Sequence, residues 1–220
     1  MAICVVRSTE QLDLGLVLTP ERYNPKRRIN TNDGQSFCKL SEFVTLANDL
    51  VTSREPGNFL VLNTSDARGG CVNIPHTSVD MLSSSKKRIR KGDVIISRLR
   101  PYLKQIAYCD VDFDNLVGST EFYVLRSRVE GDSIAFLLPF LLSETVQRVF
   151  QSAVEGSQHP RFQPQDLLEL PLPQNLVEKK DSMSERVEMA LAHYRMYNSE
   201  LGSLVNDCES DFEAVSERTV

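Results

Sequence analysis

The sequence lacks the features that mark several classes of protein. Its 220 residues contain no tryptophan, only three histidines, and no apolar run near the roughly 18 residues that a membrane-spanning helix requires. The five cysteines are widely spaced without a C-x-x-C pair, which predicts free thiols in a reducing compartment and no structural zinc site. Because Met1–Ser8 also shows no signal-peptide pattern, we expect a cytoplasmic protein that has no metal site and does not enter a membrane.

The common catalytic signatures are missing as well. The chain contains neither of the glycine-rich phosphate-binding patterns GxGxxG and GxxxxGK[ST], no GxSxG nucleophile elbow and no HExxH motif. Asn24-Pro25-Lys26 departs from the Asn/Asp-Pro-Pro-aromatic motif of adenine methyltransferases. Glu178-Lys179-Lys180, which has the form of a nuclease triplet, opens a predicted helix. These absences favour a binding module, with no catalytic residue and no cofactor, over an enzyme.

Basic residues gather in one stretch although the whole chain is acidic. Hydrophobic residues make up 41% and charged residues 25%, which are globular proportions, and the formal net charge is −5. Residues 175–220 carry the excess of acids, whereas Asp93 is the only acid within Ser84–Tyr108. Such clustering of bases is the electrostatic signature of phosphate binding; the alternative is a solvated charged loop. The basic residues of the stretch are Lys86, Lys87, Arg88, Arg90, Lys91, Arg98, Arg100 and Lys104.

Residue patterns predict an α+β fold for the first three quarters of the chain. Apolar runs bounded by turn residues predict strands, the clearest of which is Val94–Ser97. Ser143 is expected to cap a helix over Glu144–Ala153, and a short helix is predicted over Lys39–Ala47. Two prolines exclude a helix or a central strand from Leu170–Pro173, which we interpret as a hinge or an exit segment that ends the compact region. The other predicted strands are Phe59–Leu62, Cys71–Ile74, Gln105–Cys109 and Glu121–Leu125.

The C-terminal segment has the pattern of one long helix. From Val177 to Val215 it contains no proline and a single glycine, and its apolar residues recur every seven residues along two lines. A helix of roughly 38 residues is about 57 Å long, and it needs a partner helix to bury such lines. We favour an antiparallel pair or a small bundle; the alternative is a helix that folds back onto its own domain. The two lines are Val187, Tyr194, Leu201, Cys208 and Val215, and Met183, Ala190, Tyr197 and Leu204.

Several short segments are informative through their order and spacing. They are Lys91–Lys104, Gly118–Arg126, Glu155–Phe162 and Leu167–Pro173, preceded by Leu40–Val44 and Leu62–Gly70 and followed by the long helix. Together they resemble the target recognition domain of the specificity subunit of type I restriction-modification enzymes. The resemblance covers residues 38–215.

The resemblance implies a fold, a function and a set of partners. It implies a mixed α+β target recognition domain over residues 1–174, in which residues 1–37 have no clear counterpart, and a long coiled-coil-type helix over residues 175–220. Such a subunit is non-catalytic, reads double-stranded DNA and directs a DNA adenine methyltransferase, together with a restriction or translocase subunit, in phage defence. The family pattern has two domains and two helices, so this chain resembles a half-subunit that reads one half-site and forms a homodimer.

Two other functions stay open at this point. The chain could be a dimeric protein-binding adaptor that has the recognition-domain fold without reading DNA, or it could conceal a nuclease. A DNA affinity that falls steeply with salt would identify a recognition subunit. Metal-dependent cleavage by the chain alone would identify a nuclease.

The candidate contact residues fall into four groups. Arg98, Arg100 and Lys104 follow a predicted strand and surround Pro101, so they can reach phosphates or guanine edges. The flexible basic cluster suited to phosphates consists of Lys86, Lys87, Arg88 and Arg90. A loop that could read bases, or that could simply reverse the chain, carries Ser157, Gln158, His159 and Arg161, and Arg68 is a further candidate. The residues expected to form the dimer are Val187, Tyr194, Tyr197, Leu201 and Leu204.

Overall fold

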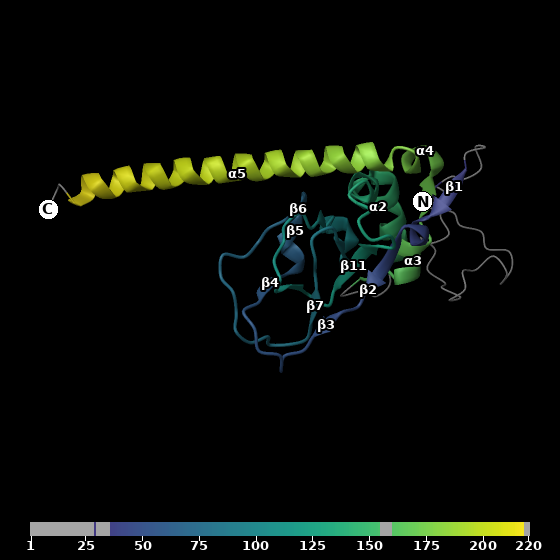
Figure 1. The fold of residues 1–220 in the computed structure, drawn as a ribbon, viewed down its shortest axis with the longest axis horizontal. Coiled ribbons are helices and arrows are strands. Elements are labelled where there is room, and N and C mark those ends of the chain that lie inside the picture. The colour runs from purple at the N-terminus through teal and green to yellow at the C-terminus, as the bar shows by residue number, and fades with distance from the viewer. Residues whose placement is uncertain (1–28, 30–35, 155–159, 218–220) are drawn as a thin grey trace, which may run out of the picture.

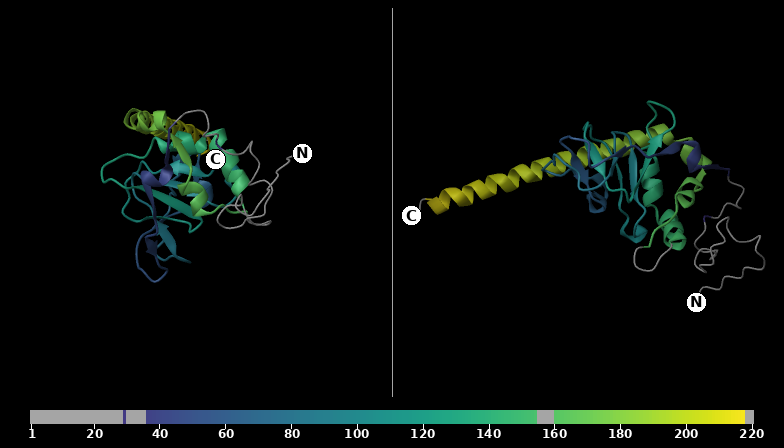
Figure 2. Two further views of the ribbon diagram at one scale, coloured as in Figure 1. Left: turned by 90° about the vertical axis from the view of Figure 1, so that its right-hand side faces the viewer. Right: turned by 90° about the horizontal axis from the view of Figure 1, so that it is seen from below.

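The computed structural model describes residue 29, residues 36–154 and residues 160–217, the last seven of these by their backbone only. Packed sheets and short helices form one domain, and a single long helix, α5 (Lys180–Glu217), runs along one side of the domain and continues far beyond it (Figures 1 and 2). The predicted α+β class and the predicted long C-terminal helix are confirmed.

The central sheet is built around a strand that is apolar on both faces. In β8 (Val94–Ser97) every residue is buried; Val94 and Ile96 contribute to one hydrophobic core, and Ile95 contributes to another. A strand of this kind needs cover on both sides, which short helices supply on one face and a second sheet on the other. The sheet has the spatial order β2 (Val44–Ala47), β11 (Phe122–Ser127), β8, β9 (Ile106–Tyr108), β6 (Gly70–Val72) and β5 (Ala67–Arg68), with only β9 and β6 parallel.

A smaller sheet covers the face to which Ile95 belongs. Gly118 lies where this sheet comes close to its neighbours, because a Cβ atom there would lie 2.6 Å from the Cδ1 atom of Ile89. Lys86–Arg88, which we expected to be flexible, is a strand in this sheet, paired on both sides by segments remote in the sequence. The order is β3 (Leu50–Val51), β7 (Lys86–Arg88), β10 (Leu116–Gly118) and β4 (Leu60–Leu62), with β10 and β4 parallel.

Three helices cover the opposite face of the central sheet: α1 (Leu137–Leu142), α2 (Glu144–Ala153) and α3 (Pro164–Leu168). The predicted cap of α2 is confirmed, since the Ser143 Oγ atom accepts a hydrogen bond from the Val146 amide at 3.4 Å. The ring of Phe150 on α2 stacks on Phe162 with ring centroids 4.5 Å apart. This contact fixes Phe162, and therefore its neighbour Arg161, against the domain.

One local prediction is wrong and another is narrowed. Lys39–Ala47 is not a helix but a short 3-10 turn (Leu40–Glu42) followed by strand β2, in which Val44 is buried and Thr45 exposed, the period of a strand. Leu170–Pro173 contains neither a helix nor a central strand, as predicted. It is an exit segment and not a free hinge, because Pro171–Pro173 forms strand β12, paired antiparallel with β1 (Phe37–Lys39), directly before the C-terminal helices. Proline is tolerated at sheet edges, and a two-stranded pair consists only of edges.

The first half of α5 packs on the domain. After the short helix α4 (Gln174–Val177), Ser184 and Leu191 are buried and Val187 packs against the core. Val187 therefore lies with its own domain and not with the exposed pairing residues. On a straight helix, residues seven positions apart are rotated by about 20° relative to each other. A heptad line that begins against the domain therefore faces away from it further along the helix. From Met196 to Ser210 every residue is exposed.

Within the described ranges, no helix is sufficiently long and apolar to cross a membrane. The same residues include no group of three His, Cys, Asp or Glu side chains that could hold a metal ion.

Candidate nucleic-acid interface

Strand β8 divides the basic stretch into two ends with different surroundings. Arg90 and Lys91 precede the strand, and Arg98 and Arg100 follow it. The four strand residues separate the two ends by about 13 Å of extended chain. β8 pairs antiparallel with β9, so the connecting segment 98–105 forms a loop at the second end. We refer to this segment as the β8–β9 loop.

At the second end, two arginines converge on one carboxylate. The Arg98 Nε atom lies 3.0 Å from Glu121 Oε2, and Arg161 donates from Nε to Oε2 at 2.9 Å and from Nη2 to Oε1 at 2.8 Å. The hydrogen bond from Arg161 is the main cause that lowers the pKa of Glu121 to about 2, with Arg98 acting in the same direction against partial burial. The shared carboxylate holds both guanidinium groups in place.

Lys87 brings a third cation to the same cluster from the other sheet. Its Nζ atom donates to the Phe122 carbonyl oxygen at 2.8 Å and lies 5.8 Å from the centre of the Tyr123 ring. Burial, and next to it the nearby charge of Arg98, lower the pKa of Lys87. Lys87 is therefore a positioned, half-buried group.

The β8–β9 loop presents two further cations on an unusual backbone. Arg100 and Lys104 are exposed and both have a φ of 50°, the left-handed conformation, which costs roughly 1–2 kcal/mol for each non-glycine residue. Between them the short helix η6 (Pro101–Leu103) buries Pro101 and exposes Tyr102 and Leu103. Contacts with the domain maintain this backbone, including the hydrogen bond from the Arg100 amide to the Pro160 carbonyl oxygen at 2.9 Å.

At the first end of β8 the charges are paired. Arg126 donates from Nε and Nη2 to the buried carboxylate of Asp93, both at 2.8 Å, and from Nη1 to Asp49 at 3.0 Å. Arg90, a predicted DNA contact, lies 3.3 Å from the same Asp49 carboxylate. The hydrogen bonds to Asp93 are the main cause that raises the pKa of Arg126. Both of these arginines therefore have acidic partners within the domain.

The remaining predicted contacts are not brought into the Glu121 cluster. Lys86 donates to Ser84 Oγ at 2.8 Å, and Arg88 donates to the Asp114 carbonyl oxygen at 3.2 Å. Arg68 is exposed at the end of the edge strand β5. The predicted contacts Ser157, Gln158 and His159 lie outside the described residues.

Sequence reasoning missed three residues of this region. Glu121 arrives from the start of β11, and no sequence pattern indicated that it would join two arginines that lie 23 and 40 positions away. Tyr102 and Leu103 are exposed by 54% and 45%. Their position between two cations in Arg-Pro-Tyr-Leu-Lys was a signal that could have identified them.

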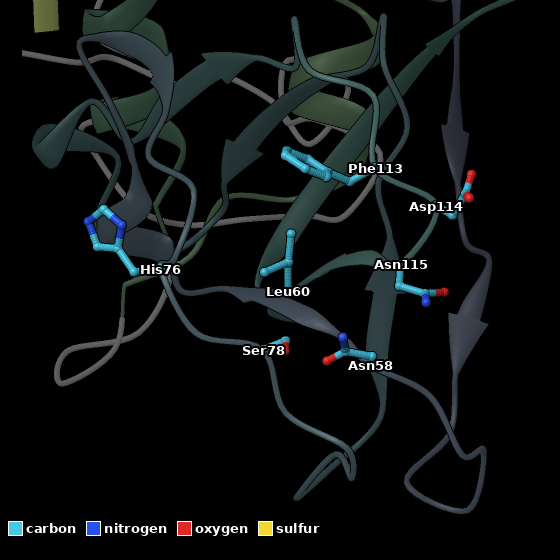
Figure 3. Close-up of a pocket in the computed structure, with 7 residues that line it drawn as sticks. All are labelled: Asn58, Leu60, His76, Ser78, Phe113, Asp114 and Asn115. Atoms are coloured by element: carbon cyan, nitrogen blue, oxygen red, sulfur yellow. The ribbon is translucent and has the colours of Figure 1, made fainter. Parts of the chain in front are cut away.

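The described residues also form a depression of about 280 Å³ at the edge of the small sheet. In the view of Figure 3, Leu60 lies between His76 and Asn115, with Phe113 above it and the Asp114 carboxylate directed away. Asn115 and Leu60 occupy the end of the β10–β4 pair that is opposite to Ser119 and Glu121. The depression is therefore separate from the Glu121 cluster.

Polar contacts fix the direction in which α5 leaves the domain. The Glu188 carboxylate accepts hydrogen bonds from Tyr108 Oη at 2.9 Å and Ser133 Oγ at 2.7 Å. Burial is the main cause that raises the pKa of Tyr108 to about 12, and the Glu188 carboxylate acts in the same direction. Further along, Arg195 forms a bidentate ion pair with Asp110. Asp110 follows β9 at the end opposite to the β8–β9 loop, so the helix leaves the domain away from the cations.

The projecting part of α5 combines apolar and acidic side chains. Four residues of the two heptad lines are exposed here, by 46%, 62%, 45% and 54% respectively: Tyr194, Tyr197, Leu201 and Leu204. No lysine or arginine occurs between Met196 and Glu217. This half of the helix is thus suited to another apolar helix face and unsuited to a phosphate backbone.

No family model matches the chain. In sequence, it is 32% identical over 77 residues to the HindI type I restriction enzyme specificity subunit of Haemophilus influenzae, a match that covers 35% of this chain and 17% of that protein. It is 26% identical over 114 residues to the EcoDI type I restriction enzyme specificity subunit of Escherichia coli, which covers 52% of this chain and 24% of that protein.

Solved structures show the same fold. The HsdS subunit of Thermoanaerobacter tengcongensis has a TM-score of 0.58 at 23% identity over 82% of this chain and 48% of that chain. A chain from a structure of a type I R-M system has a TM-score of 0.53 at 22% identity over 80% of this chain and 48% of that chain. The chain therefore has the fold of a target recognition domain with its helix. Its homologues and structural neighbours are specificity subunits of type I restriction enzymes, and it spans about half the length of the solved ones.

Proposed function

We propose that the chain is a non-catalytic DNA sequence-recognition subunit of a type I-like restriction-modification or related phage-defence system. Homology to specificity subunits supports this function. The observation that carries it is the cluster of cations at the second end of β8. Arg98 and Arg161 are held by Glu121, Lys87 lies beside them, and Arg100 and Lys104 are exposed on the adjacent loop. An excess of fixed and exposed cations is what a phosphate backbone requires.

The cations divide into two kinds that suit different contacts. Arg98 and Arg161 are oriented by Glu121, so their guanidinium groups are pre-positioned and can fix the register of the duplex. Arg100 and Lys104 extend from the loop into solvent, where an arginine can bind the O6 and N7 atoms of guanine in a bidentate manner. In this proposal the loop reads bases and the Glu121 cluster supplies the anchor.

The projecting half of α5 pairs two copies of the chain. The residues that would meet are Tyr194, Tyr197, Leu201 and Leu204, on a part of the helix that its own domain leaves exposed. An antiparallel pair related by a two-fold axis would place one recognition domain at each end. The target would then be palindromic, with one half-site per chain and a fixed spacer.

The partners follow from the same proposal. Residues 1–174 form the recognition unit and residues 175–220 the dimerisation and spacer helix, and a separate DNA adenine methyltransferase carries out the modification. A restriction or translocase subunit completes the system. Affinity purification of the tagged chain from its native lysate should recover a stoichiometric methyltransferase, and recovery of the chain alone would count against this partner.

The test of DNA recognition is the salt dependence of binding by the purified chain. A subunit that neutralises several phosphates should lose roughly 10³-fold or more in affinity for duplex DNA between about 50 and 200 mM salt. The exposed apolar line of α5 also suits an adaptor that binds only protein. An adaptor would show no DNA binding at the lowest salt, and that result would replace the proposed function.

The test of pairing uses a charge on the apolar line. Tyr197→Glu should convert a dimer to a monomer, as measured by light scattering, because it places a carboxylate in the helix–helix contact. Asn198→Glu is the matched control, since Asn198 is exposed, adjacent and off both lines. Equal masses for the two variants and the unmodified chain would refute pairing through this half of the helix.

A further inference from the structure

The tip of the β8–β9 loop combines exposed apolar side chains with flanking cations. Tyr102 and Leu103 are exposed by 54% and 45%, directly between Arg100 and Lys104. Adjacent exposed apolar side chains form a small apolar patch, and apolar patches bordered by polar residues are features of contact sites.

The other exposed large apolar residues of the domain have a different neighbourhood. In the described sequence before α5, each of them is adjacent to an aspartate or glutamate in the chain: Leu50, Val79, Met81, Phe113 and Val129. An adjacent carboxylate opposes the approach of a phosphate backbone. Tyr102 and Leu103 alone in this set have no acidic neighbour in the chain, and they lie between two cations, so within this set they are the best placed to approach DNA.

The backbone presents this pair in a fixed shape. Left-handed residues at both ends, Arg100 and Lys104, bracket the turn, and hydrogen bonds from the Leu103 amide to Arg100 and from the Lys104 amide to Pro101, each 2.9 Å, close it. Pro101 is buried, so the turn rests on the domain. Strained left-handed residues persist where surrounding contacts enforce them, and such positions cluster at ligand contacts.

We propose that Tyr102 and Leu103 form a wedge that enters between two base pairs of double-stranded DNA while Arg100 and Lys104 contact the DNA on either side of the opened step. This inference rests on the proposed function and assigns two residues that DNA charge recognition does not include. Apolar wedges partly unstack a base step and kink the duplex. The tyrosine ring supplies a stacking surface, and the leucine fills the opened space.

The experiment uses the full chain and a pair of duplexes, one uninterrupted and one with a two-nucleotide bulge that already disrupts stacking. Because a wedge then has less unstacking to do, the unmodified chain should prefer the bulged duplex by about tenfold. The double variant Tyr102→Ser, Leu103→Ser should lose this preference but keep its affinity for the uninterrupted duplex within about threefold, since the cations remain. Met81→Ser, which changes an acid-flanked exposed residue, should behave like the unmodified chain.

The outcomes separate the wedge from the proposed function. If the unmodified chain binds neither duplex, both proposals fail. If it binds both with steep salt dependence but without preference, or if the preference survives in the double variant, DNA binding stands and the wedge is refuted. Fluorescence energy transfer between labels at the duplex ends gives a second readout, because the wedge predicts a bend that the double variant abolishes.

Discussion

The two ends of strand β8 carry the same kinds of side chain in opposite situations. At the first end, Arg126 and Arg90 have the carboxylates of Asp93 and Asp49 as partners within the domain. At the second end, Glu121 is shared by Arg98 and Arg161, and Arg100 and Lys104 have no ion-pair partner among the described residues. The difference shows that the basic character of a segment does not indicate its function. The acids that surround it decide whether a cation stabilises the fold or remains available to a ligand.

The largest expected effect is on stability, at the first end. Arg126→Ala leaves the Asp93 carboxylate, whose side chain is 2% exposed, without its guanidinium partner. An unpaired buried charge should lower the free energy of unfolding by about 3–5 kcal/mol. Urea denaturation followed by circular dichroism measures this loss.

The control for Arg126→Ala also removes the charge of Asp93, which the single variant leaves without a partner. The double variant Arg126→Ala, Asp93→Asn should recover a large part of the lost stability, because a neutral amide costs less to bury. A single-variant loss below about 1 kcal/mol would mean that the pair behaves as an exposed salt bridge, and the contrast between the two ends of β8 would weaken.

The second effect is on binding, at the second end. Arg100→Ala should lower sequence-specific DNA affinity by about 1–3 kcal/mol if Arg100 reads a base, while the free energy of unfolding changes by about 0.5 kcal/mol or less. Competition binding between duplexes measures the first, and denaturation the second. An equal loss on all sequences would reassign Arg100 to a phosphate contact.

Lys91→Ala is the matched control for Arg100→Ala. Lys91 is also an exposed cation, but it lies at the first end of β8. Its removal should leave sequence-specific affinity within about twofold, since it contributes at most a distant screened charge. A loss equal to that of Arg100→Ala would show that charge alone, irrespective of position, governs binding.

The smallest effect concerns the acid dependence of stability. The pKa of Glu121 in the folded chain is about 2, against an ordinary value of 4.5. Its carboxylate therefore stabilises the fold above pH 4.5, and this stabilisation is lost as the pH falls toward 2. Glu121→Gln should lower the melting temperature at pH 7 and flatten its decline in acid. The contribution should be about 1 kcal/mol or less, because the paired groups are partly exposed. Glu144→Gln, which removes an exposed pair with Arg148, should change the acid profile less than Glu121→Gln does, because solvent screens that pair more strongly.

Parts of the fold that depend on local patterns could be predicted from the sequence. The apolar run Val94–Ser97, the Ser143 cap before Glu144–Ala153 and the proline-free C-terminal segment determine their own structure. Parts that depend on remote partners could not. Lys86–Arg88 has no apolar pattern and is a strand because β3 and β10 pair with it, and Leu170–Pro173 pairs with a strand more than 130 residues earlier.

The candidate site shows the same limit. The concentration of cations was visible in the sequence, and the β8–β9 loop was correctly placed after a strand. The division of those cations was not visible, because Asp49 and Glu121 reach them only through the folding of the sheets. Whether the predicted residues contact DNA stays a prediction that the variants above can decide.

Among the described side chains, the ion pair of Arg195 with Asp110 is the last polar contact between α5 and the domain. The helix continues for about 33 Å beyond it, at 1.5 Å per residue. A small change in the direction of α5 has a large effect at this length. If the helix tilts by about 6° at the ion pair, its far end moves by about 3.4 Å, the rise of one base pair. The rigidity of the side chains that hold α5 at this ion pair therefore determines how accurately the far end of the helix positions a partner.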